Sequence, residues 1–348
     1  MTMKALVLKE YNQLVYQDAP VPTVEPDDVL VGVKACGICG SDVHGIDGST
    51  GRRIPPLIMG HEAAGIVAEV GSNVKDVQPG ERITFDSTVY CGSCFYCRRG
   101  EINLCDQRRV LGVACDAYRQ NGALAEYVAV PQHILYRLPE GLSFEHAAMV
   151  EPCSIAFHAV NRTPTSSQDT AVVVGAGIIG LLVIQILRAV GCGKIIAVDI
   201  EPEKLELSRQ FGADLTINSS ALEAVSEIQK LTHHRGADVV IEAVGITPSV
   251  KTALASVRRG GAVTVIGNLS PHVELPLQRL VAGEISLYGS CASQGDYPAC
   301  LDMIARGAIN LDPLISSVSP LSEGANWFRR LYQKEKGLLK VILVPEPG

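Results

Sequence analysis

Residues 171–180 read Ala-Val-Val-Val-Gly-Ala-Gly-Ile-Ile-Gly, a short β-branched run followed at once by a Gly-x-Gly-x-x-Gly pattern. The run predicts a buried strand and the residues after it predict a helix, which is the context that this glycine pattern requires. Gly175 would permit the tight turn, Gly177 would let a pyrophosphate approach the backbone, and Gly180 would let helix and strand pack closely. The stretch therefore predicts the first β-turn-α unit of a dinucleotide-binding sheet.

Short apolar runs alternate with helical stretches after this unit. A typical helix is expected at 202–211, with Pro at its first position and Gly212 after its end. The apolar runs predict six strands, at 171–174, 195–198, 215–217, 239–241, 263–266 and 285–287. Strands joined by helical crossovers predict an α/β fold with a doubly wound parallel sheet. The uncharged segment 170–187 is long enough to suggest a membrane helix, but its glycines favour a buried strand, a turn and a buried helix.

The first 150 residues differ in composition: they are rich in Gly, Pro and short β-branched runs, such as 29–33, 64–70 and 82–84. Short strands with many turns predict an all-β, partly closed barrel. After Ser290 the chain is expected to be helical at 297–306 and 323–334. A final strand at 340–344 is expected to return to the first domain.

Four cysteines, Cys91, Cys94, Cys97 and Cys105, lie close together in the sequence. An all-cysteine shell suits tetrahedral zinc and leaves no position open for substrate, so the spacing predicts a structural zinc site. A disulfide framework is disfavoured without a secretion signal. Iron–sulfur clusters use related but different spacings.

A second set of possible ligands is scattered along the chain. Cys39, Ser41 and His44 share one short loop, His61-Glu62 forms an adjacent pair, and Glu151 precedes the α/β region. Cysteine, histidine and carboxylate ligands suit a catalytic zinc with one open position. Each residue has a plainer interpretation: Cys39 as a small apolar core residue, His61 as a hydrogen-bonded core histidine, and the glutamates as surface charges.

Asp199 ends the second predicted strand of the α/β region. A carboxylate there accepts hydrogen bonds from the adenosine ribose and repels a 2′-phosphate, and no arginine follows at 200 or 201. The pattern favours NAD over NADP.

Composition excludes several classes of function. The 348 residues carry a formal net charge of −7 and no long basic run, so nucleic-acid binding has no support. The N-terminus lacks the apolar core and cleavage site of a signal peptide. Eleven cysteines without a targeting segment favour a reducing cytoplasm, with some of them on metal.

In these motifs and their order, Gly-His-Glu at 60–62, the four cysteines and Gly-Ala-Gly-Ile-Ile-Gly at 175–180, the whole chain resembles the zinc-dependent medium-chain dehydrogenases, and among them the polyol (sorbitol-like) branch. The resemblance implies a GroES-like catalytic domain from 1–156 and 291–348, with a zinc lobe at about 88–106. It implies a Rossmann NAD-binding domain at 157–290, and two zinc ions per subunit.

The resemblance also implies roles for single residues. Cys39, His61, Glu62 and Glu151 match the catalytic zinc site, with Cys153 as a rival ligand. Ser41 and His44 match a relay that takes the hydroxyl proton to the surface. The positions that match cofactor contacts are Gly175, Gly177, Ile179, Gly180, Asp199, Lys204, Ile266, Asn268, Ser290, Ala292 and Lys340. Among them, the resemblance implies that Lys204 contacts the adenosine ribose and Lys340 the pyrophosphate. It also implies that segments 266–268 and 290–292 line the nicotinamide.

The resemblance is weakest at the residues expected to contact the substrate. Sorbitol-type enzymes often carry an arginine and an aromatic residue after the last Rossmann strand, where this chain has Gly-Ser-Cys-Ala-Ser-Gln at 289–294. Arg52 and Arg53 are either solvated or bind an anionic substrate such as a sugar-alcohol phosphate. We expect oxidation of a secondary alcohol of a polyol or sugar derivative.

Three other functions compete with this expectation: an L-threonine 3-dehydrogenase, a catalytically silent NAD-binding relative, and a zinc-free quinone reductase. The last is disfavoured by the four cysteines and by Asp199. Members of the family pair through the last Rossmann strand, here around 285–289, so the resemblance implies a homodimer or homotetramer. We expect no membrane partner.

Overall fold

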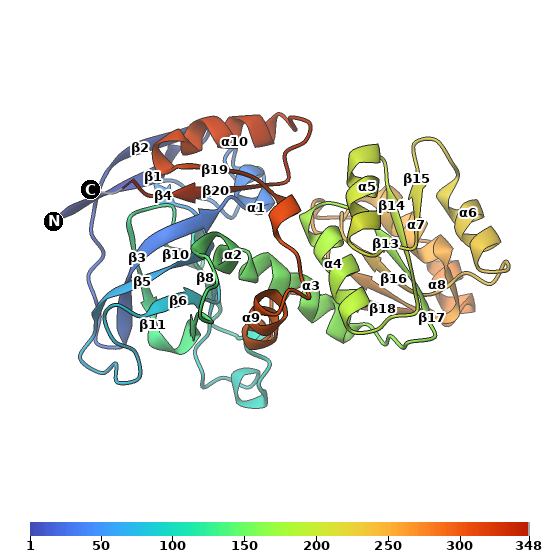
Figure 1. Cartoon of the computed structure of the whole chain (residues 1–348), viewed down its shortest axis with the longest axis horizontal. Helices are drawn as coiled ribbons and strands as arrows, with labels where there is room; N and C mark the ends of the chain where they lie inside the picture. Colours follow the sequence, from blue (N-terminus) through green and yellow to red (C-terminus); the bar gives the residue numbers. More distant parts are fainter. Residues whose placement is uncertain (347–348) are drawn as a thin grey trace. The chain divides into compact units, whose positions relative to one another are not determined.

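The computed structural model describes residues 1–346 and divides the chain into two compact units (Figure 1). The first unit comprises Met1–Glu151, Tyr297–Ala305 and the chain from Leu311 onward. The second comprises Pro152–Asp296 and Arg306–Asn310. The first boundary therefore falls at 151/152 rather than at the expected 156/157, and the second at 296/297 rather than at 290/291. A short piece, 306–310, also belongs to the second unit.

A seven-stranded sheet forms the body of the first unit, in the order β12–β6–β5–β3–β20–β19 with β11 also paired to β3. Its strands are β3 (Asp28–Gly37), β5 (Glu62–Val70), β6 (Arg82–Phe85), β11 (Tyr127–Pro131), β12 (Leu135–Arg137), β19 (Ile315–Pro320) and β20 (Lys340–Val344). The predicted return of the tail is seen in β20, which pairs antiparallel with β3 through Leu343 and Cys36.

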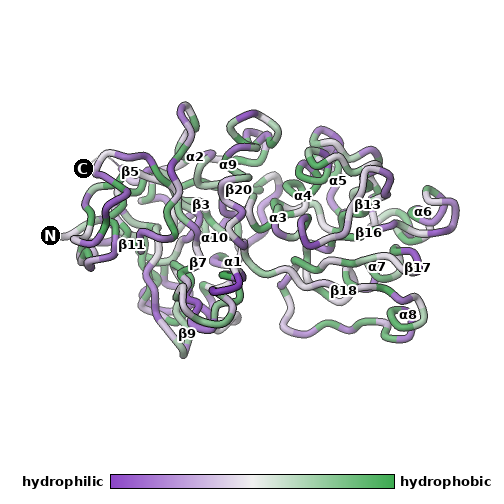
Figure 2. Tube along the Cα trace, turned by 90° about the horizontal axis from the view of Figure 1, so that it is seen from below, coloured by the Kyte–Doolittle hydropathy of each residue, from purple (hydrophilic) through white to green (hydrophobic). Residues whose placement is uncertain are grey.

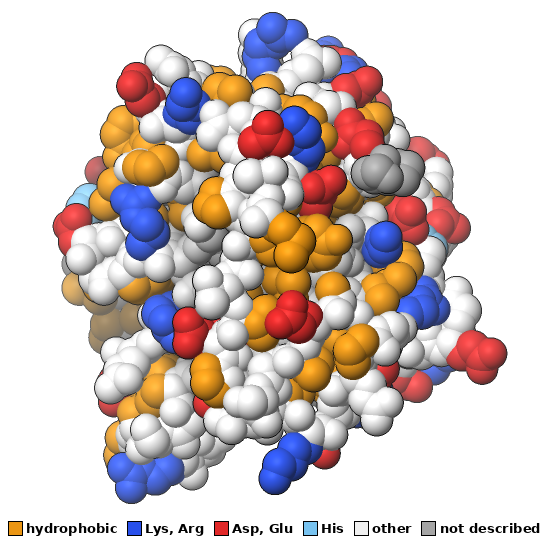
Figure 3. All heavy atoms as spheres, turned by 90° about the vertical axis from the view of Figure 1, so that its left-hand side faces the viewer, with side chains coloured by type: hydrophobic (Ala, Val, Ile, Leu, Met, Phe, Trp, Pro, Cys, Tyr) orange, Lys and Arg blue, Asp and Glu red, His pale blue; other side chains and the backbone are white. Residues whose placement is uncertain are grey.

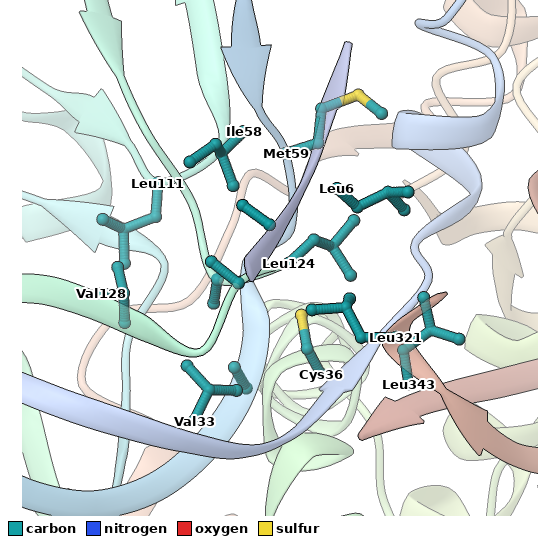
Figure 4. Packing of buried hydrophobic residues seen from close by; sticks show 14 of the residues in the cluster. Leu6, Val33, Cys36, Ile58, Met59, Leu111, Leu124, Val128, Leu321 and Leu343 are labelled. Carbon is teal, nitrogen blue, oxygen red and sulfur yellow. The ribbon is translucent and has the colours of Figure 1, made fainter. Parts of the chain in front are cut away.

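A three-stranded sheet, β2–β1–β4, packs its apolar side chains into the same core. Its strands are β1 (Thr2–Glu10), β2 (Gln13–Pro20) and β4 (Leu57–Ile58). Figure 4 shows Leu6 from β1, Leu124, Cys36 from β3 and Leu343 from β20 within one buried cluster. Segments from both ends of the chain therefore contribute to this core.

The remaining elements of the first unit are short. Two small antiparallel sheets pair β7 (Thr88–Val89) with β8 (Arg109–Val110) and β9 (Val113–Cys115) with β10 (Tyr118–Gln120). The helices are α1 (Gly40–Val43), α2 (Phe144–Ala148), α9 (Tyr297–Ala305) and α10 (Gly324–Tyr332). The face in Figure 3 intersperses acidic, basic and apolar side chains, so it offers no broad basic field for nucleic acid.

A six-stranded, fully parallel sheet forms the second unit, in the order β15–β14–β13–β16–β17–β18. Its strands are β13 (Thr170–Val174), β14 (Lys194–Asp199), β15 (Leu215–Asn218), β16 (Ala237–Glu242), β17 (Val257–Val265) and β18 (Ser286–Gly289). The predicted doubly wound sheet is confirmed. The strand order reverses between β13 and β16, and this switch point is where such sheets bind ligands.

The helices of the second unit are α3 (Val150–Arg162), which begins in the first unit, α4 (Ile178–Ala189), α5 (Pro202–Gln210), α6 (Ala224–Leu231), α7 (Thr247–Ser256) and α8 (Leu277–Ala282). Helix α5 begins with proline as predicted, and Gly212 follows its end with φ +105°. Figure 2 shows hydrophobic residues along α4, whose residues 180–187 are buried. Segment 170–187 thus forms β13, the glycine turn and α4. Within residues 1–346 no helix combines the length and the apolar character that crossing a membrane requires.

Candidate metal and cofactor sites

Pairing between β3 and β5 assembles the first metal cluster. Gly37 at the end of β3 pairs with Glu62 at the start of β5, which places the Cys39 turn beside His61. The ligand atoms of Cys39, His61 and Glu62 all lie within 4.8 Å of one another. A Cβ on Gly37 would lie 2.3 Å from Oε2 of Glu62, so a larger residue here would displace that carboxylate. One thiol, one imidazole and one carboxylate form a donor set that suits zinc with a position left open.

Glu62 forms a buried ion pair with Lys340, a residue that was expected to contact the cofactor. The side chain of Glu62 is 1% exposed, and the Nζ of Lys340 lies 2.5 Å from Oε2 and 3.0 Å from the carbonyl oxygen of Ile38. Burial lowers the pKa of Lys340, but the nearby Glu62 and Cys39 outweigh this effect and leave it raised. Lys340 was expected to contact a pyrophosphate; in the structure its ammonium is buried against a metal-cluster carboxylate.

Glu151, at the start of α3, lies beside the cluster rather than in it. It is buried, and the hydroxyl of Ser87 donates to its Oε1 over 3.1 Å. Burial raises the pKa of Glu151 to about 8; His61 opposes the shift, whereas Glu62 and Cys39 add to it. Within residues 1–346, neither Glu151 nor Cys153 belongs to a convergent group of ligand atoms.

Burial also raises the pKa of the Cys39 thiol, to about 12, and the charge of Glu62 adds to the shift. Ser41 lies two residues after Cys39, in α1, and its hydroxyl donates to Sγ of Cys39 over 3.2 Å. His44 caps the C-terminus of α1 and is partly exposed. The Cys39 turn therefore places the hydroxyl of Ser41 against the cluster, and both Ser41 and His44 are accessible to solvent.

Sequence reasoning missed Asp42. It is fully buried, its Oδ2 lies 3.4 Å from Nδ1 of His61, and its Oδ1 binds Arg53. The contact uses Nδ1 of His61 and leaves Nε2 for a metal. No spacing rule connects positions 42, 53 and 61, so only the folded loop reveals this contact.

The four-cysteine lobe forms the second cluster, and its sulfur atoms also lie within 4.8 Å of one another. Sγ of Cys91 and Sγ of Cys97 are 4.0 Å apart, which is far from a disulfide bond and close to the about 3.8 Å between two sulfurs on tetrahedral zinc. The backbone N–H of Cys91 donates to Cys105, and that of Cys97 donates to Cys94. Backbone N–H groups of Ser93 and Cys94 lower the pKa of Cys91 to about 6. The lobe fits a structural zinc ion.

The glycine turn after β13 is shaped as its pattern requires. Gly175 has φ +96°, and its N–H donates to the carbonyl of Val198 over 2.8 Å. A Cβ on Gly180 would lie 1.8 Å from the carbonyl oxygen of Gly175, so helix and turn are in close contact there. A Cβ on Gly177 would meet nothing within 4 Å. Open space in front of Gly177 fits the approach of a pyrophosphate to the backbone.

Asp199 at the end of β14 holds this turn. Its Oδ2 accepts the N–H of Ala176 over 2.6 Å, and its Oδ1 accepts the N–H groups of Ile200 and Glu201. Lys204, expected at the adenosine ribose, is paired with Glu201 over 2.7 Å. The carboxylate therefore lies at the mouth of the glycine turn.

Glu242, which ends β16, is a second residue that sequence reasoning missed. It is fully buried, and its Oε1 accepts the N–H groups of Val244 and Gly245. Its carbonyl oxygen accepts the N–H groups of Ile266 and Gly267, which join the expected nicotinamide segment to this loop. The other expected segment begins at Ser290, whose N–H donates to Val265 over 3.0 Å. Asn268 and Ala292 follow within these two segments, at the carboxyl ends of β17 and β18. A carboxylate at the end of an apolar strand was the only signal for Glu242.

Comparison with known proteins places the chain in a family. Residues 25–140 match the alcohol dehydrogenase GroES-like domain and residues 179–306 match the zinc-binding dehydrogenase domain. Sorbitol dehydrogenase of Bacillus subtilis strain 168 is 35% identical over 99% of this chain and 97% of its own length. The chain belongs to the zinc-dependent medium-chain dehydrogenase family.

A further curated relative and a solved structure are also similar to this chain along nearly its whole length. D-arabitol-phosphate dehydrogenase of Enterococcus avium is 33% identical over 97% of the chain and 95% of its own length. A zinc-binding dehydrogenase from Sinorhizobium meliloti 1021, solved with NADP bound, superposes with a TM-score of 0.91 at 33% identity, covering 99% of this chain and all of that one. The predicted family is confirmed, and the chain is a dehydrogenase that uses a nicotinamide cofactor.

Proposed function

We propose that this dehydrogenase oxidises a secondary alcohol of a polyol or sugar derivative to the ketone and transfers the hydride to NAD. The observation that supports it best is the convergence of Cys39, His61 and Glu62 in a chain that also carries an intact glycine turn with Asp199. The sorbitol and D-arabitol-phosphate dehydrogenases among its relatives support the substrate class.

Different residues of the chain would bind the two zinc ions and transfer the proton. Cys39, His61 and Glu62 would hold the catalytic zinc, which when bound supplies Lewis-acid polarisation of the alcohol oxygen. Ser41, beside Cys39, would accept the hydroxyl proton, and His44 would pass it to solvent. Glu151, buried beside the cluster, would bind the zinc either directly as a fourth ligand or through water. The four-cysteine lobe would hold the second zinc.

The preference for NAD rests on Asp199. Its carboxylate faces the glycine turn, and neither Ile200 nor Glu201 supplies a cation to neutralise a 2′-phosphate. Since one related structure holds NADP, both cofactors need to be compared directly.

Arg52 is the arginine left for an anionic substrate, such as a sugar-alcohol phosphate. It is exposed, whereas Arg53 is 4% exposed and bound to Asp42. Arg52→Met should raise the KM for a polyol phosphate and leave that for the free polyol unchanged. Equal KM changes for both substrates would remove Arg52 from substrate binding.

The decisive experiment is reduction of NAD and of NADP by the zinc-loaded protein against free polyols, polyol phosphates, L-threonine and simple secondary alcohols. Strong turnover of one polyol class with NAD supports the proposal. Turnover of threonine would favour the L-threonine 3-dehydrogenase instead. Cofactor binding without any turnover would indicate a catalytically silent relative.

We also propose a homodimer or homotetramer that pairs through β18. This strand is an edge of the six-stranded sheet, so its outer hydrogen-bonding groups are available for a second copy. Leu287 on β18 and Leu277 and Val281 on the adjacent α8 are exposed. Leu287→Lys should shift the mass measured by light scattering toward the monomer.

The eleven cysteines, all free of disulfides, agree with a reducing compartment.

A further inference from the structure

Arg53 enters the protein interior beside the metal cluster. Its side chain is 4% exposed, and it passes directly over Gly45, where a Cβ would lie 2.4 Å from Cγ of Arg53. The arginine therefore depends on a glycine eight positions earlier for its path. A solvated or substrate-binding arginine would not need such a path.

The guanidinium reaches two metal-cluster residues, each through one intermediary. Nε and Nη2 of Arg53 lie 2.7 and 2.6 Å from Oδ1 of Asp42. The other oxygen of Asp42 lies 3.4 Å from Nδ1 of His61. Nη2 also donates to Oγ of Ser41 over 3.2 Å, and that hydroxyl donates to Sγ of Cys39. Nη1 donates to the carbonyl of Arg52, which holds the plane of the group.

Within the described residues, the ring of His61 is oriented through its contact with Asp42. Neither Oδ2 of Asp42 nor Nδ1 of His61 has a hydrogen-bond partner there, so the 3.4 Å approach is the polar contact that orients the imidazole. Asp42 is itself held through Oδ1 by Arg53. A change in the guanidinium would therefore change the orientation of His61.

We propose that Arg53 is a positioning residue of the metal site, which aligns His61 through Asp42 and Cys39 through Ser41. Because it needs the Cys39–His61–Glu62 site to bind metal, the inference rests on the proposed function. The planar guanidinium carries donors in a fixed fork, so it contacts Asp42 and Ser41 at once. A lysine ammonium would balance the charge of Asp42 but is a single point that cannot hold both partners in one plane.

The test measures zinc release to a chromogenic chelator from the full-length protein loaded with two zinc ions. The four-cysteine lobe serves as an internal reference, and His61→Ala identifies the phase that belongs to the catalytic site. In Arg53→Met we expect about 10- to 100-fold faster release from the catalytic site, the effect typical of lost outer-shell partners, and unchanged release from the lobe.

Two further variants separate alignment from charge and from folding. Arg53→Lys should keep the melting temperature close to that of the wild type and still release catalytic-site zinc about tenfold faster. Gly45→Ala removes no polar group but displaces the Arg53 side chain, so it should act in the same direction. Arg52→Met is the matched control and should leave both release phases unchanged.

Several results would overturn the inference: wild-type release from Arg53→Met, full rescue by Arg53→Lys, or equal acceleration at both sites. No substrate enters this test. A wild type that is inactive on every alcohol but shows the expected release pattern would refute the substrate proposal alone. A wild type that takes up only one zinc ion per chain would refute this inference together with the catalytic metal site.

Discussion

The ammonium of Lys340 lies 2.5 Å from the carboxylate of Glu62, although the two residues are 278 positions apart. Both side chains are almost fully buried, at 4% and 1% exposure. A buried carboxylate needs a cation, and here the cation comes from the last strand of the sheet. Lys340 therefore compensates the charge of Glu62 from within the protein itself.

Lys340→Met should therefore destabilise the metal-free protein, by about 3–5 kcal/mol in the free energy of unfolding, because it leaves a buried charge uncompensated. Added zinc should restore more stability in this variant than in the wild type, since the ion then supplies the missing positive charge. Thermal unfolding with and without zinc measures both effects. Lys336→Met removes an exposed lysine of the same segment and should change neither; equal zinc-induced shifts in Lys340→Met and wild type would contradict the explanation.

Cys94→Ser should reduce the zinc content from two ions per chain to one and lower the melting temperature, because three ligands hold a structural zinc poorly. Elemental analysis after gel filtration measures the stoichiometry. Cys115→Ser, at a partly buried cysteine outside both clusters, is the control and should retain both ions. Retention of two ions by Cys94→Ser would argue against the lobe as a zinc site.

The glycine turn allows stability and cofactor binding to be separated. Gly177→Ala meets open space, so it should fold normally and yet bind NADH at least about tenfold more weakly, as the methyl group occupies the path of the pyrophosphate. Gly180→Ala meets the Gly175 carbonyl and should lose stability as well. Fluorescence titration with NADH and thermal unfolding give the two readouts. Wild-type affinity in a folded Gly177→Ala protein would place the cofactor elsewhere.

Asp238 provides a pH-dependent contribution to stability in the second unit, whereas both metal clusters belong to the first. Burial alone would raise its pKa, but the N–H of Thr170 and the guanidinium of Arg258 hold the pKa of Asp238 below its usual value. Since the folded pKa lies below the unfolded one, this stabilisation is present above about pH 4 and is lost as the pH falls through the folded pKa.

Asp238→Asn should accordingly be less stable than the wild type at pH 7, and the difference should shrink below about pH 4. Urea unfolding at several pH values measures it. Asp18→Asn breaks an exposed pair with Lys4 and should cost little at any pH. A difference for Asp238→Asn that stays constant from pH 7 to pH 3 would exclude the ion pair as its cause.

The parts predicted from sequence are those whose determinants are local. The turn at Gly175 and the strand that ends at Asp199 follow from neighbouring residues, because a glycine pattern and an apolar run specify their own backbone. The parallel sheet follows from their repetition. The four cysteines likewise lie within one short segment.

The parts that sequence reasoning missed depend on distant partners. Arg53 looked like a surface or substrate residue until its path over Gly45 and its contact with Asp42 were visible. Lys340 matched a cofactor contact in the resemblance, and only the pairing of β20 with β3 brings it near Glu62. Side chains that neutralise a buried charge follow from the fold rather than from any spacing.

The position of β20 has a consequence for biosynthesis. The first unit is assembled from the beginning and the end of the chain, whereas nearly all of the second unit is one continuous segment. While the ribosome is still translating the second unit, β3 has no β20 beside it and Glu62 has no Lys340. The cluster of Cys39, His61 and Glu62 therefore reaches its final electrostatic balance only after residue 340 has been added, so zinc captured earlier would bind a site still lacking its own cation.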